Sequence, residues 1–70
     1  MPREPVSSSV IAAIGYDPQF QWLEVELKTG SLYLYREVPA RIHQDFMAAL
    51  SKGSFYKSRI RDDYSFVRVR

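Results

Sequence analysis

The sequence contains no cysteine and only one histidine, His43. Without cysteine, neither a disulfide bond nor a thiolate metal site can stabilise the fold. One histidine among scattered carboxylates is not a metal-binding set, so we expect no metal and no cofactor. No nucleophile lies at helical spacing from His43, which we expect to be a solvated surface residue. From these residue types we predict no catalytic residue and expect that the protein is not an enzyme.

Long apolar runs are also absent. No run is longer than Val10–Ile14, which is far too short to span a bilayer. No apolar segment of the kind found in secretory signals follows Met1–Pro5. We therefore expect a cytoplasmic protein with no membrane partner and, since it lacks a catalytic set, no small-molecule substrate.

What the chain does contain is enough apolar material for a folded core. Hydrophobic residues make up 46% of its 70 residues and aromatic residues 14%, which is too apolar for a disordered segment. This length predicts one small domain over residues 1–70. Because Pro2 and Pro5 disfavour regular strand pairing, residues 1–5 are expected to form a flexible lead-in.

Three strands of an antiparallel meander are predicted. Residues 9–16 are rich in β-branched side chains, and residues 20–28 alternate between apolar and polar side chains. Asp17-Pro18 separates these two strands as a turn. Residues 31–36 form the third strand, which returns after a second turn at residues 28–30.

The second turn decides which side chains enter the core. A two-residue loop at Thr29–Gly30 would place two leucines there, whereas a three-residue loop would place Tyr33 and Tyr35 there. Threonine rarely adopts a positive φ, and Gly30 suits the left-handed position of the longer loop. The sequence therefore favours the three-residue loop with tyrosines in the core. That register leaves three apolar side chains on the outer face of the sheet: Trp22, Leu32 and Leu34.

Helical patterns follow the third strand. Pro39 suits the first turn of a helix, and residues 40–52 carry an apolar stripe at helical spacing, formed by Ile42, Phe46, Ala49 and Leu50. Gly53 is a typical residue at a helix C-terminus. A second short helix is expected over residues 54–62, anchored by Phe55 and Ile60. Residues 66–70 alternate strictly, which predicts an edge strand or an extended tail.

Together these elements predict an α+β fold. It consists of a small three-stranded antiparallel β-meander, with a possible fourth C-terminal edge strand, packed against one main helix and a second short helix.

Positive charge is concentrated in the last part of the chain. Residues 1–50 carry a net charge of −2, whereas residues 51–70 carry +4. Aromatic rings lie among these cations, and the combination suits nucleic acid because arginine binds phosphate in a bidentate manner and stacks on bases. On a helix, Lys57 and Arg61 would share a face, with Arg59 on another. The candidate RNA contacts are Lys57, Arg59, Arg61, Arg68, Arg70, Tyr56 and Tyr64.

Several short motifs also occur in a fixed order along the chain: Val6-Ser7-Ser8-Ser9, Ile14-Gly15-Tyr16-Asp17, Leu23-Glu24-Val25-Glu26, Gly30, Tyr33-Leu34-Tyr35, Val38-Pro39, Ser51-Lys52-Gly53, Phe55 and Ile60-Arg61. This ordered set resembles the KTSC family, named for the C-terminal domain of some lysyl-tRNA synthetases and also found as stand-alone bacterial proteins. The resemblance covers residues 6–66. The family usually has a polar residue between its two tyrosines, where this chain has Leu34.

The resemblance implies two expectations. Its tyrosines, here Tyr33 and Tyr35, face the core. The family has no established activity, and RNA binding is proposed for it through its association with a synthetase, so RNA is the implied partner and no catalytic residue is carried over.

Two functions therefore stay open. One is RNA binding of low specificity through the basic C-terminal segment, and the other is protein interaction or self-association through Trp22, Leu32 and Leu34. Arginines gathered on one face would favour RNA binding, whereas arginines paired with acidic side chains would favour the interaction module. Ser7–Ser9 is interpreted as a strand entry rather than as an anion site.

Overall fold

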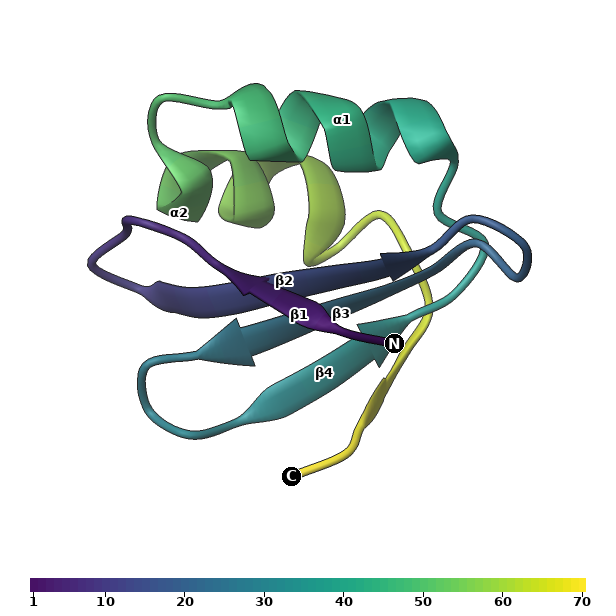
Figure 1. Ribbon diagram of the computed structural model, residues 1–70, viewed down its shortest axis with the longest axis horizontal. Helices are drawn as coiled ribbons and strands as arrows, with labels where there is room; N and C mark the ends of the chain where they lie inside the picture. Colours follow the sequence, from purple (N-terminus) through teal and green to yellow (C-terminus); the bar gives the residue numbers. More distant parts are fainter.

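The protein forms a five-stranded antiparallel sheet with its helices on one face (Figure 1). This computed structural model describes all of residues 1–70. The strands lie in sequence order and are β1 (Arg3–Pro5), β2 (Ile11–Asp17), β3 (Trp22–Leu27), β4 (Leu32–Tyr35) and β5 (Phe66–Arg68). The helical segments between β4 and β5 cover the inner face of the sheet, and the outer face carries no helix. The α+β class is confirmed, with more strands than expected.

The hairpin of β3 and β4 has the predicted three-residue loop. Gly30 adopts a φ of 99° and donates its N–H to the carbonyl oxygen of Leu27, 2.9 Å away. In the resulting register Tyr35 lies opposite Leu23 and Tyr33 lies opposite Val25. Both tyrosines therefore point to the inner face, as expected from the turn chemistry.

The flexible lead-in predicted for residues 1–5 is wrong, because Arg3–Pro5 forms β1 against β2. The N–H of Val6 donates to the carbonyl oxygen of Ala12, and in an antiparallel pair every second residue makes such bonds. The backbone N–H of Val6 points toward β2, so the nitrogen of the preceding Pro5, which has no hydrogen, faces the open edge of the sheet. A proline is tolerated at that position of an edge strand.

Helix α1 (Ala40–Ala48) begins directly after Pro39, as predicted, but ends earlier than expected. The chain becomes extended at Ala49, and the hydroxyl of Ser51 accepts the N–H of Ser54 to start a new helix. Leu50 therefore lies in the connection and is fully exposed, so its predicted place in the core is wrong.

The second helical segment begins and ends two residues earlier than predicted and has two parts. Helix α2 (Lys52–Phe55) continues into a π-helical turn, η1 (Tyr56–Ile60), in which the N–H of Arg61 donates to the carbonyl oxygen of Tyr56. Gly53, expected as a terminal residue, lies inside α2. None of the helices has the length and apolar character required to cross a membrane.

The core lies between the inner face of the sheet and the helices. Phe46 of α1 and Ile60 of η1 are completely buried in it, and Phe46 stacks on Phe55 with 5.4 Å between ring centroids. The anchoring roles expected for Phe55 and Ile60 are confirmed. The buried cluster is formed by Ile11, Ile14, Leu23, Val25, Tyr35, Val38, Phe46, Tyr56 and Ile60.

The contrast between Ile60 and Leu50 gives a test of this packing. Ile60→Val removes one buried methylene and should lower the free energy of unfolding by about 0.5–1.5 kcal/mol. Leu50→Ala removes exposed atoms only and should change it by less than about 0.5 kcal/mol. Urea denaturation followed by circular dichroism measures both, and a larger effect at Leu50 would contradict the observed helix boundary.

Candidate functional site

The basic C-terminal residues are divided between two elements. Lys57, Arg59 and Arg61 belong to η1 or follow it directly, whereas Arg68 and Arg70 belong to β5 or follow it. Lys57 and Arg61 line one cleft, while the guanidinium of Arg59 lies elsewhere, 5.3 Å from the ring centroid of Phe55. The cations of η1 thus have the two orientations that the sequence predicted.

The two arginines of the C-terminal strand differ in their partners. Arg70 forms an ion pair of 2.9 Å with Glu26 and donates to the carbonyl oxygen of Gly30. Arg68 donates to the hydroxyl of Ser31, and its guanidinium lies 6.0 Å from the ring centroid of Tyr33. Arg70 is therefore neutralised by a carboxylate, whereas Arg68 stays available beside an aromatic ring.

A small apolar cleft lies between β4, β5 and η1. Its volume is about 270 Å³, and it is lined by Val10, Leu27, Tyr33, Tyr35, Tyr56, Lys57, Arg61 and Phe66. Lys57 and Arg61 are exposed at its border, and Arg68 adds a third cation through its contact with Tyr33. A concave apolar surface bordered by a few charged groups is the usual form of a binding site.

Two aromatic rings of this cleft are accessible from solvent. Phe66 is 49% exposed and meets the edge of Tyr33, with 5.4 Å between ring centroids. Tyr33 points to the inner face, as expected for a core residue, but its side chain is only half-buried. Phe66 was not among the candidate RNA contacts. Its position near Arg68 in a segment of alternating residues could have indicated an aromatic residue beside a cation. Only the pairing of β5 with β4, however, places Phe66 on the inner face.

The deepest part of the cleft is a pair of tyrosines, Tyr35 and Tyr56, which are 1% and 5% exposed. Their hydroxyl oxygens are 2.6 Å apart and share a hydrogen bond. Burial raises the pKa of Tyr35 far above its usual value and also raises the pKa of Tyr56, and the nearby positive charge of Arg61 opposes both shifts. Tyr56, predicted to stack on bases, is instead a core residue and cannot offer its ring face to a ligand.

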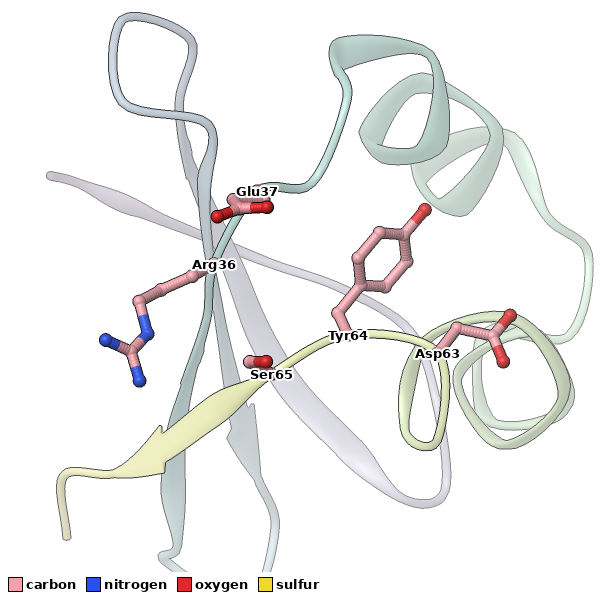
Figure 2. A pocket seen from close by; sticks show the side chains of 5 residues that line it. All are labelled: Arg36, Glu37, Asp63, Tyr64 and Ser65. Atoms are coloured by element: carbon pink, nitrogen blue, oxygen red, sulfur yellow. The ribbon is translucent and has the colours of Figure 1, made fainter.

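A separate polar hollow of about 540 Å³ is lined by Arg36, Glu37, Asp63, Tyr64 and Ser65 and is shown in Figure 2. Arg36 and Asp63 extend away from each other there, so no charged groups converge. Tyr64, the other predicted base contact, is half-buried against the core cluster. Arg61, Arg36 and Phe66 line a further hollow next to it. Asp62 and Asp63 also line that hollow, so acidic side chains lie among the cations between the cleft and Arg36.

The outer face holds the alternative set of candidates. Trp22 stacks on the exposed ring of Phe20, with 5.0 Å between ring centroids. Leu34 is half-buried, and Leu32 is buried rather than exposed, so the apolar patch is smaller than the sequence predicted. Two further exposed apolar residues of this face, Val67 and Val69, lie on or beside β5.

Two remaining sequence interpretations have different outcomes. The hydroxyl of Ser8 accepts the N–H groups of Val10 and Ile11, which supports the strand-entry interpretation of the serine run. The expectation of a solvated His43 is wrong, because the imidazole ring of this α1 residue stacks on the ring of Tyr16, with 4.6 Å between ring centroids. Burial lowers the pKa of His43, and the carboxylate of Glu4 on β1 partly opposes that shift.

Comparison with known proteins gives a family. The KTSC domain model matches residues 7–64. A protein from Tsukamurella paurometabola is 41% identical over 66 residues, which is 94% of this chain and 98% of that protein. An uncharacterized protein from Stutzerimonas stutzeri is 41% identical over 70 residues and covers 99% of both chains.

Longer proteins and a solved structure also match. A lysine–tRNA ligase from Nostoc punctiforme is 34% identical over 61 residues, which is 87% of this chain but only 11% of the ligase. The crystal structure of a KTSC domain protein from Yersinia pestis superposes with a TM-score of 0.96 at 42% identity, covering 99% of this chain and 97% of that chain.

The stacked histidine leads to a pH prediction. Because the pKa of His43 lies below 6.5 in the folded protein, the unfolded chain binds the proton more readily. The stability associated with neutral His43 is complete above pH 6.5 and is lost as the pH falls below that value. We expect acidification from about pH 7.5 to 5.5 to lower the free energy of unfolding less in His43→Phe than in the unmodified protein. Equal losses in urea titrations of the two proteins would contradict this assignment.

Proposed function

The chain belongs to the KTSC domain family, and from that premise we propose that it is a small, non-enzymatic module that binds single-stranded RNA with low sequence specificity. The cleft between β4, β5 and η1 is the proposed binding site. The observation that carries this proposal is the gathering of three cations, Lys57, Arg61 and Arg68, around an aromatic cleft. Phosphate groups are held by such cations, and bases stack on accessible aromatic rings.

This proposal revises the residue set that the sequence suggested. Tyr33 and Phe66 replace Tyr56 and Tyr64 as the stacking rings, because they are the accessible aromatic residues of the cleft. Arg70 is left out, since Glu26 already neutralises it. Arg61 approaches only Asp62, at 3.8 Å and with both groups exposed to solvent, so this pair competes weakly with a phosphate.

The relatives support RNA as the ligand class. Lysine–tRNA ligases of two Nostoc strains contain a segment similar to this chain, at 34% and 33% identity. A binding module of this kind supplies cations and rings and needs no reacting side chain. The single histidine supports that view, because it stacks on Tyr16 away from the cleft residues.

A titration of labelled single-stranded RNA at several salt concentrations tests the proposal. If three phosphates are neutralised, the logarithm of the binding constant should fall with the logarithm of salt concentration with a slope of about −2. In the double variant Lys57→Gln and Arg61→Gln one cation remains, and the slope should flatten to about −0.7. Arg41→Gln is the matched control, since Arg41 is exposed on α1 and does not line the cleft. An unchanged slope in the double variant would exclude these two residues as phosphate contacts.

A second candidate function, self-association, is favoured by one observation. The edge strand β5 exposes apolar side chains, with Phe66 and Val67 about half exposed and Val69 beside them. Exposed strand edges of this kind pair with other chains unless a charge or a proline blocks them.

Light scattering at rising protein concentration tests this second function. We expect a dimer that dissociates in Val67→Lys, because a lysine on an edge strand opposes pairing while its exposed position leaves the fold intact. Leu50→Lys introduces the same charge at an exposed apolar residue far from the edge in sequence and should leave the dimer unchanged. A strict monomer at every concentration would exclude self-association.

A further inference from the structure

The hydrogen atoms of the tyrosine pair do not balance within the protein. Each tyrosine hydroxyl has one hydrogen to donate and lone pairs to accept. Tyr35 and Tyr56 share one hydrogen bond of 2.6 Å, and neither hydroxyl makes any other hydrogen bond to the chain. One of the two hydrogens is used between them, so the other has no acceptor in the protein.

The pair that carries this hydrogen lies at the cleft. Both tyrosines are nearly completely buried, and both line the cleft beneath Tyr33 and Phe66. The hydrogen that the pair does not use is therefore free to be donated to a group in the cleft. Because their burial raises both pKa values, the two hydroxyls keep their hydrogens at physiological pH. The cleft therefore offers one strong donor and free lone pairs to a group that enters it.

Resting on the proposed function, we propose that the hydroxyl pair of Tyr35 and Tyr56 binds the Watson–Crick edge of one unpaired base. A base edge places a donor beside an acceptor, as the N3–H and O4 of uracil do. The base N–H donates to the first hydroxyl, the first hydroxyl donates to the second, and the second donates to the base acceptor. Every hydrogen in this ring has a partner.

The same geometry explains how such a site can accept different bases. Either tyrosine can be the donor in the shared hydrogen bond, so the pair can present its donor on either side. Each of the four RNA bases has a donor next to an acceptor on its Watson–Crick edge, and the pair can match either order. The cleft holds about 270 Å³, near the lower end for small-molecule pockets, which suits one base rather than two. The consequence is a preference for single strands over duplexes, whose Watson–Crick edges are occupied.

The test compares two RNA oligomers and two proteins. The probes are single-stranded oligouridine and the same length of oligo-3-methyluridine, in which a methyl group blocks the donor on the base edge. The variant Tyr35→Phe with Tyr56→Phe removes both hydroxyls together, so that no buried partner is left unpaired. Its fold is checked by circular dichroism and thermal unfolding. Tyr64→Phe is the matched control, because Tyr64 does not line the cleft.

We expect the unmodified protein and Tyr64→Phe to bind oligouridine about tenfold more tightly than oligo-3-methyluridine, since about one or two hydrogen bonds distinguish the probes. The double phenylalanine variant should bind both probes equally. Equal, salt-sensitive binding of both probes by the unmodified protein would overturn the inference and leave the phosphate contacts in place. Discrimination that persists in the double variant would be due to the size of the methyl group and would also overturn it. Binding to neither probe would remove the proposed function as well.

Discussion

The pairing of β3 with β4 depends on the backbone conformation of Gly30. Its φ of 99° is readily adopted only by glycine, and it closes a loop of three residues between the two strands. That loop places Tyr33 opposite Val25 and Tyr35 opposite Leu23, on the face that the helices cover. A shift of one residue would move both tyrosines to the outer face. The cleft would then lose its deepest side chain, so a turn outside the cleft determines the chemistry of the proposed site.

The sheet also separates charges between its two faces. On the outer face, Glu26 of the central strand forms ion pairs with Arg3 of β1 and with Arg70 after β5, and Glu24 forms an ion pair with Arg3 as well. These partly exposed pairs each stabilise the fold modestly, but together they link both edge strands to β3. These carboxylates pair with Arg3 and Arg70, and the cations around the cleft on the inner face have a single ion pair, between Arg61 and Asp62.

Local chemistry made part of this structure predictable. The hairpin register followed from Gly30 and the alternation around it, and the start of α1 followed from Pro39. The features that the sequence did not predict depend on which residues of a strand form its hydrogen bonds, or on contacts between residues distant in sequence. Pro5 is acceptable in β1 only because its nitrogen faces the open edge, and Tyr56 is buried because the π-helical turn and α2 set its direction. No sequence pattern near residue 66 shows that β5 brings Phe66 onto the inner face.

The hydroxyl pair gives the cleft a chemistry that two phenylalanines would lack. Phenylalanine in place of both Tyr35 and Tyr56 would fill nearly the same space, but it would offer an entering group neither a donor nor an acceptor. If the cleft binds RNA as proposed, the cations at its border would attract many anions, and selectivity for unpaired bases would have to come from the deeper hydroxyls.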